Sequence, residues 1–115
     1  MLRPTLLLLM HQGPAHGYEL ADKLKSFGIE GIDPSLIYRA LRDMEEEGAI
    51  QSTWDEEKTQ GPPRRVYTLT ASGNDSLRLY IQDMQTTRKR IDDLLQAYSL
   101  HMKDGNGQFH EKGDE

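Results

Sequence analysis

Two adjacent arginines, Arg64 and Arg65, are the side chains in this chain best suited to binding an anion. They follow Pro62 and Pro63 in the run GPPRRVYTLTASG, which spans residues 61–73. Because proline fixes φ and has no backbone N–H, the two prolines predict a stiff loop tip. The residues after the arginines alternate with period two and are rich in β-formers, which predicts a strand. The run therefore predicts a rigid, basic hairpin tip that requires an anionic partner.

The composition requires any nucleic-acid binding to be local. The 115 residues include 14 Lys and Arg against 19 Asp and Glu, which gives a formal net charge of -5. An acidic chain does not coat a nucleic acid or a membrane surface by bulk charge. The clustering of the cations is therefore more informative than their number.

Residue types exclude several kinds of chemistry. The sequence has no cysteine, which excludes disulfides, thiol redox chemistry and cysteine-ligated zinc, and fits a reducing cytoplasm. Its four histidines lack metal-ligand spacing, and no nucleophile accompanies a base. The apolar run from Leu6 to Met10 is far shorter than the ~20 residues of a membrane span. We expect a cytoplasmic protein that is not an enzyme and has no cofactor, metal or membrane partner.

Turn and capping residues divide the first half of the chain into three helices. A nearly all-apolar helix is expected over about residues 4–11, and a second over about 17–27. Asp33 and Pro34 supply an N-cap and a proline at the first helical position of the third helix, which Gly48 closes. The expected buried residues are Tyr18, Ala21, Leu24 and Phe27 in the second helix, and Ile37, Ala40, Leu41 and Met44 in the third.

A β-hairpin follows, with strands over about residues 50–55 and 65–69. Three helices and a hairpin in this order predict a winged helix-turn-helix, in which the third helix enters the DNA major groove. The expected fold class is thus mainly α with a small β-hairpin. The third helix and the hairpin tip supply the candidate DNA-binding residues, which are Ser35, Tyr38, Arg39, Arg42, Arg64 and Arg65.

Three of these candidates have a second interpretation. Arg39 and Arg42 are alternatively solvated surface residues that pair with Asp43 and Glu46 one turn further along the helix. Tyr38 is either a core aromatic or the donor of a hydrogen bond to phosphate. Its position off the apolar stripe favours phosphate.

A long helix is expected from Ala71 to about Met102, with Thr70 as its N-cap. Apolar residues recur along it at alternating spacings of four and three, interrupted only by Arg88. A small domain cannot cover so long a seam, which predicts a homodimer. The seam consists of Leu77, Ile81, Met84, Arg88, Ile91, Leu95, Tyr98 and Met102.

The chain is therefore expected to have three parts. Residues 1–70 form the winged-helix DNA-binding domain, and residues 71–103 form the dimerisation helix. Residues 104–115 are rich in glycine and polar side chains, which predicts a disordered tail.

Trp54 is the single tryptophan and shares a strand face with Ile50 and Ser52. It is expected to pack between the hairpin and the long helix. Its alternative role is to bind an effector, because a flat aromatic side chain near a dimer cleft suits an aromatic ligand.

Three stretches together resemble the PadR family of transcriptional regulators. They are HGYEL at residues 16–20, DPSLIYRALRDMEEEGAI at 33–50 and GPPRRVYTLTASG at 61–73, and the resemblance covers roughly residues 6–77. It implies a homodimeric winged-helix DNA-binding protein, usually a repressor, in which the C-terminal helix makes the dimer. It also implies that small molecules, often aromatic or hydrophobic, release the protein from its operator. With one C-terminal helix, the chain resembles the compact branch of the family.

The resemblance assigns the third-helix candidates to operator contacts, assigns the two arginines to wing contacts, and makes Tyr18 either a core residue or a backbone contact. The predicted function is sequence-specific regulation of transcription, as a repressor released by a small aromatic or hydrophobic effector. The alternative is a winged-helix protein-interaction module that does not bind DNA.

Overall fold

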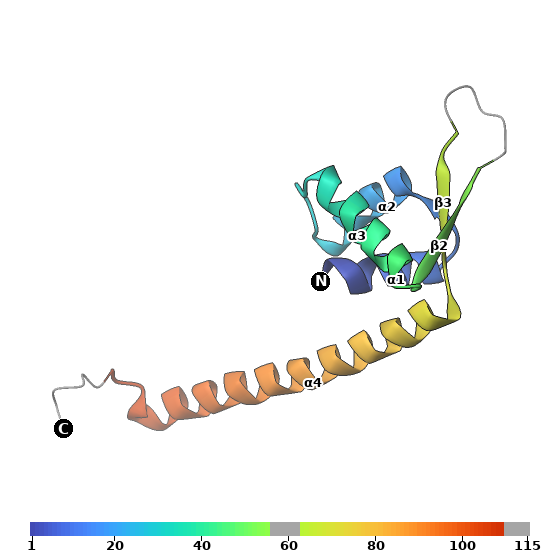
Figure 1. Ribbon diagram of the computed structural model, residues 1–115. Helices are drawn as coiled ribbons and strands as arrows, with labels where there is room; N and C mark the ends of the chain where they lie inside the picture. The colour runs from blue at the N-terminus through green and yellow to red at the C-terminus, as the bar shows by residue number, and fades with distance from the viewer. Residues whose placement is uncertain (56–62, 110–115) are drawn as a thin grey trace. The chain divides into compact units, whose positions relative to one another are not determined.

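The computed structural model describes residues 1–55 and 63–109 (Figure 1). The elements of the first half are α1 (Leu2–His11), β1 (Ala15–His16), α2 (Gly17–Leu24), the 3-10 turn η1 (Lys25–Phe27) and α3 (Pro34–Glu46). They are followed by β2 (Ile50–Trp54), β3 (Arg65–Leu69), α4 (Ala71–His101) and the π-helical turn η2 (Met102–Asn106). The predicted winged helix-turn-helix with a long C-terminal helix is confirmed. The predicted loop tip at Pro62 lies outside the described residues.

The hydrophobic core lies between α1, α2, α3 and the sheet. Leu6, Leu20 and Leu41, one from each helix, are fully buried, and each such side chain contributes roughly 1.5–3 kcal/mol through burial. Tyr67 of β3 is buried in the same cluster. The predicted buried stripe of α3 is confirmed at all four positions, which are Ile37, Ala40, Leu41 and Met44.

The buried face of α2 differs from the prediction. Leu20 and Leu24 are fully buried and define the stripe, whereas 52% of Tyr18 is exposed. Tyr18 precedes Leu20 by two residues, or about 200° around the helix, and therefore points away from the core. Phe27 is also exposed, because the helix tightens into η1 before reaching it. The core interpretation of Tyr18 is thus wrong.

The sheet has three antiparallel strands in the order β1-β3-β2, one more than the predicted hairpin. Strand β1 pairs Ala15 with Tyr67 and His16 with Val66. Two residues are too few to show a period of two, so the sequence pattern did not reveal this strand. The strand anchors the start of α2 directly to the wing.

Thr70 joins the wing to α4 and caps the helix, as predicted. Its hydroxyl oxygen accepts a hydrogen bond from the N–H of Gly73 at 3.0 Å and lies 2.6 Å from the carbonyl oxygen of Gly48, to which it donates. Its own N–H donates to the carbonyl oxygen of Ala49 at 3.1 Å. The first turn of α4 is therefore fixed to the end of the helix-turn-helix.

Packing divides the chain into two compact units, Met1–Ile81 and Gln82–Glu115, with the division inside α4. Leu77 of the predicted seam is buried in the core of the first unit. In the second unit, Ile91, Leu95 and Tyr98 are exposed along α4. The predicted tail begins within η2 and extends into residues 110–115, which lie outside the described residues. Among the described residues, no helix combines the length and the apolarity that a membrane crossing requires.

Candidate nucleic-acid interface

Helix α3 begins with a strong N-cap that orients its first turn. The Asp33 carboxylate accepts a hydrogen bond from the N–H of Ser35 at 2.9 Å, and Pro34 occupies the first helical position. The hydrogen bond to Ser35 lowers the pKa of Asp33, so the carboxylate stays ionised at neutral pH. The predicted contact residues of this helix, Ser35, Tyr38, Arg39 and Arg42, are all exposed.

Neither Arg39 nor Arg42 forms an ion pair with any residue in the described part of the chain. Asp43, the predicted partner of Arg39, instead lies 3.9 Å from the guanidinium of Arg3 on α1. The intrahelical pairs of the second interpretation are therefore not formed. Both guanidinium groups remain available to an external acceptor.

Two of the three glutamates at the C-terminal end of α3 have partners within the protein. Glu45 accepts hydrogen bonds from the hydroxyl of Ser52 at 2.7 Å and from its backbone N–H at 3.1 Å. Glu47 accepts two hydrogen bonds from Arg3, at 2.8 and 3.0 Å. Glu45 thus links α3 to β2, and Glu47 links it to α1. These two carboxylates at the C-terminal end of α3 therefore stabilise the packing of the domain.

The two wing arginines are held by aromatic rings. The guanidinium carbon of Arg64 lies 4.9 Å from the ring centre of Tyr18, and that of Arg65 lies 4.6 Å from the ring centre of Trp54. Arg65 also donates a hydrogen bond to the hydroxyl of Ser52 at 2.8 Å. Cation–π contacts of this kind contribute about 0.5–1 kcal/mol at exposed sites. Both arginines nevertheless remain exposed.

The expectation that Trp54 packs between the hairpin and the long helix is wrong. Its side chain is 56% exposed and its neighbour is Arg65, which pairs with it across the two strands. Burial along this strand face falls from Ile50, at 1% exposure, to Trp54, because the wing extends beyond the helical core. Alternation identified the correct face but could not show where the core ends.

His16 connects three elements at the start of α2. Its Nδ1 lies 2.6 Å from a carboxylate oxygen of Glu19, and its Nε2 lies 2.8 Å from one of Asp55, just after β2. Its ring also stacks on that of Tyr18, with centres 5.4 Å apart. The hydrogen bonds to Glu19 and Asp55 raise the pKa of His16, and the hydrogen bonds from His16 lower the pKa of Glu19.

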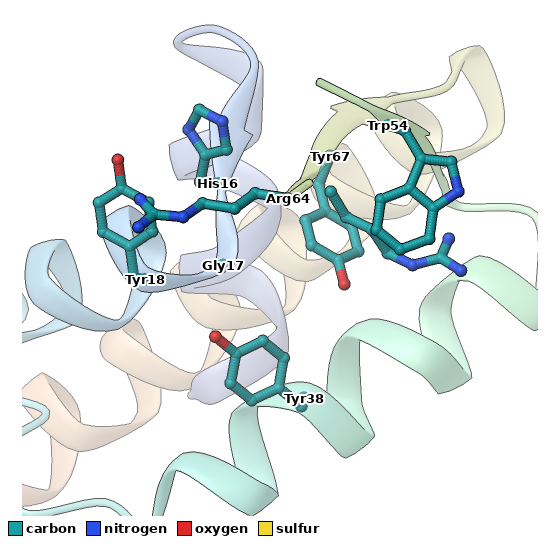
Figure 2. A pocket seen from close by; sticks show the side chains of 8 residues that line it. His16, Gly17, Tyr18, Tyr38, Trp54, Arg64 and Tyr67 are labelled. Atoms are coloured by element: carbon teal, nitrogen blue, oxygen red, sulfur yellow. The ribbon is translucent and has the colours of Figure 1, made fainter. Parts of the chain in front are cut away.

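An open groove of about 630 Å³ lies between the start of α2, helix α3 and the wing (Figure 2). Tyr38 approaches Gly17 closely: a Cβ built on Gly17 would lie 2.7 Å from Cε1 of the tyrosine ring. Figure 2 shows the hydroxyl groups of Tyr38 and Tyr67 directed into the space between these elements. Burial raises the pKa of Tyr67, which therefore stays neutral. The lining residues are His16, Gly17, Tyr18, Tyr38, Trp54, Arg64, Arg65 and Tyr67.

The structure thus brings together Tyr38, Trp54 and the two wing arginines, which were predicted from different segments. Ser35, Arg39 and Arg42 lie on α3 but do not line the groove. Sequence reasoning missed the ion pairs of His16, because Asp55 is 39 residues away and only the sheet register brings it close. The nearest signal was local, since a glutamate three residues after His16 is the pattern of a capping box.

A family model described as the transcriptional regulator PadR-like family matches residues 6–79. The chain belongs to this family. Membership in a family of transcriptional regulators confirms the prediction that the PadR-like protein is not an enzyme. A comparison with proteins of curated function found no match.

Solved structures share the fold over most of the PadR-like chain. A conserved protein of unknown function, described as a potential transcriptional factor, is 38% identical with a TM-score of 0.78, over 89% of this chain and 90% of that one. A PadR family transcription regulator from Clostridium difficile R20291 is 26% identical with a TM-score of 0.73, over 82% and 97% of the two chains.

Bacillus subtilis PadR, whose structure was solved in complex with operator DNA, is 27% identical with a TM-score of 0.62. The match covers 70% of the present chain and 46% of the Bacillus protein. The present chain is therefore similar to a little under half of that longer regulator.

Proposed function

We propose that this PadR-like protein is a cytoplasmic homodimer that binds double-stranded operator DNA and regulates transcription. The observation that carries the proposal is that one unit of an acidic chain holds two kinds of exposed cation. Arg39 and Arg42 of α3 form no ion pair among residues 1–55 and 63–109, and the wing arginines Arg64 and Arg65 lie over aromatic rings. The operator complex of Bacillus subtilis PadR supports DNA as the ligand.

The recognition helix is suited to read DNA with its N-terminal half. Arg39 and Arg42 are exposed and without ion pairs in the described part of the chain, as a residue that contacts a base edge or a phosphate requires. Ser35 adds a hydroxyl donor one turn before Arg39, and Tyr38 adds a hydroxyl donor at the groove. We assign base contacts to the two arginines and backbone contacts to the two hydroxyl groups.

The wing arginines are suited to hold the DNA backbone. Because Tyr18 and Trp54 already restrict Arg64 and Arg65, less side-chain entropy is lost when a phosphate binds. Phosphate contacts of this kind fix orientation but carry little sequence information. The wing is therefore expected to raise affinity for any duplex.

The homodimer rests on the exposed apolar residues of α4. The helix has 31 residues and is about 46 Å long at 1.5 Å per residue. Ile91, Leu95 and Tyr98 remain exposed in the single chain, and pairing with a second α4 buries them. A two-fold dimer is expected to place its recognition helices ~34 Å apart, on successive major grooves.

We further propose that the protein is a repressor that a small aromatic or hydrophobic molecule releases from DNA. Exposed Trp54 beside Arg65 offers a flat ring and a cation, which suits an aromatic ligand with an anionic group. A ligand there competes with phosphate for the same arginine. A thermal-shift screen with aromatic acids, combined with Trp54 fluorescence, tests this assignment, because a ligand of the native state raises its apparent stability.

The DNA-binding proposal is tested by salt titration of binding to the DNA upstream of the protein's own coding region, measured by fluorescence anisotropy. We expect Arg64→Ala and Arg65→Ala each to weaken binding and to lower the salt slope by roughly one unit for each phosphate interaction that the substitution removes. Arg78→Ala is the matched control, because Arg78 lies on α4 beside Asp75. Absence of binding up to micromolar protein would favour the alternative, a protein-interaction module.

A further inference from the structure

We propose that His16 is the positioning residue that fixes the wing arginine Arg64 for its phosphate contact, by holding Glu19 and Asp55 at once with its two ring nitrogens. The inference rests on the proposed DNA binding and adds a pH-dependent control to it. His16 itself has only part of its side chain exposed and need not touch DNA.

Four contacts around His16 form a closed circuit. His16 Nε2 lies 2.8 Å from the Asp55 carboxylate, and the backbone N–H of Asp55 donates to the carbonyl oxygen of Arg64 at 2.7 Å. The Arg64 guanidinium covers the Tyr18 ring, and that ring stacks on His16. Figure 2 shows the Arg64 side chain extending along the groove towards Tyr18, below His16. Arg64 is thus contacted at its backbone by Asp55 and at its guanidinium by Tyr18, and both of these residues also contact His16.

The circuit requires a charged His16. An ionised carboxylate only accepts hydrogen bonds, so both ring nitrogens must donate, and only the imidazolium form carries two N–H groups. When the proton is lost, one of the two carboxylates faces a nitrogen lone pair at hydrogen-bond distance. The contact with Asp55, which spans two elements, is the one that the chain can release by a movement of the wing.

Several described elements place charged or titratable groups near His16 or in the groove that it lines. Helix α2 contributes Glu19, with Lys23 one turn further along, and the end of β2 contributes Asp55. The wing contributes the cations Arg64 and Arg65 together with Tyr67, and α3 contributes Tyr38. The carboxylates of Glu19 and Asp55 each contact the His16 ring directly, whereas the two arginines lie over the rings of Tyr18 and Trp54. The carboxylates therefore favour the protonated form of His16 and raise its pKa.

The direction of the pH effect follows from these shifts. Because the folded pKa of His16 lies above its ordinary value of 6.5, the stabilisation is present below pH 6.5 and is lost as pH rises through the folded value. The folded pKa of Glu19 lies below its ordinary 4.5, so its contribution is present above that value and is lost as pH falls through the folded one. The circuit is therefore intact between the folded pKa of Glu19, which lies below 4.5, and the folded pKa of His16, which lies above 6.5.

The first test uses the free protein. Proton NMR should show the His16 ring titrating above pH 6.5, with the Tyr18 ring resonances following the same curve. Asp55→Asn should move that titration to lower pH, because one carboxylate is removed while the side-chain shape is kept. Titration of His16 at or below 6.5 in the wild type would overturn the proposal whether or not the protein binds DNA.

The second test measures affinity for a mixed-sequence duplex of about two helical turns at low salt, from about pH 6 to 9. Wild-type affinity should fall as pH rises, and His16→Gln should be roughly three- to tenfold weaker at the acidic end with a flattened pH profile. His11→Gln, at an exposed position on α1, is the control and should retain the wild-type profile. In an Arg64→Ala background His16→Gln should have little further effect, since the two residues act through one contact.

Equal pH profiles for wild type and His16→Gln would overturn the positioning role while leaving DNA binding intact. Absence of duplex binding by every variant would instead contradict the proposed function and, with it, the role of the circuit in DNA contact. The NMR titration separates the two failures, because it reports the circuit without DNA.

Discussion

The α-carbon of Gly73 lies against the carbonyl group of Ala49. A Cβ built on Gly73 would be 1.9 Å from the Ala49 oxygen and 2.9 Å from its carbon. The same carbonyl oxygen accepts the N–H of Thr70, so the first turn of α4 is fixed to the turn between α3 and β2. The start of α4 is therefore in direct backbone contact with the turn that follows α3.

Gly73→Ala is expected to destabilise the protein. Alanine gains up to about 1 kcal/mol of helix propensity over glycine. Forcing a methyl group against a fixed backbone carbonyl costs typically about 1–3 kcal/mol or more, so the steric effect exceeds the gain. Urea denaturation of the variant should show a lower midpoint.

Ser72→Ala is the matched control for this substitution, because Ser72 is the exposed neighbour of Gly73 on the same turn. Its unfolding free energy should stay within about 0.5 kcal/mol of wild type. A Gly73→Ala variant as stable as Ser72→Ala would show that the helix and the Ala49 turn separate easily.

Gly17→Ala is expected to weaken DNA binding with little loss of stability. The added methyl group meets the far end of the Tyr38 ring, 2.7 Å away, and a side chain can rotate where a backbone cannot. The displaced Tyr38 hydroxyl would then miss the phosphate contact that we propose for it. Binding should fall to the level of Tyr38→Phe, which removes the same hydroxyl, and the effects of the two substitutions should not add. Normal affinity in both variants would remove Tyr38 from the interface.

Arg39→Ala and Arg42→Ala are expected to reduce discrimination between operator and random duplex. A guanidinium that reads a base edge contributes about 1–3 kcal/mol of discrimination, whereas a phosphate contact contributes equally to all sequences. Parallel anisotropy titrations on the two duplexes measure the ratio. An equal loss on both would reassign the arginine to the DNA backbone.

Leu95→Glu is expected to dissociate the dimer, because it places a charge in the apolar seam of α4. Leu95 is 59% exposed in the single chain, so the substitution leaves the monomer fold unaffected. Truncation at Thr87 should likewise yield monomers in sedimentation velocity. Gln96→Glu adds the same charge beside the seam and should remain dimeric. Dimers that survive both changes in the seam would place the interface elsewhere.

Local sequence patterns determined most of the elements and which side chains are candidates for the interface. Asp33 with Pro34 defined the start of the recognition helix, and its apolar stripe of period 3.6 separated Tyr38, Arg39 and Arg42 from the core. Alternation gave the bounds of β3 correctly. These features depend on residues within one or two turns of each other, so the sequence alone was sufficient to predict them.

Tertiary structure decided which of these side chains act together. The register of the three-stranded sheet places His16 beside Asp55. Trp54 lies beyond the core and is exposed, with Arg65 over its ring. Tyr18 lies on the face of α2 opposite the core and contacts Arg64. The contacts of His16 with Asp55 and of Tyr18 with Arg64 join residues far apart in the chain, and none of the three contacts produces a periodic signal. Their geometry follows from packing of the three helices against the sheet, which no local pattern encodes.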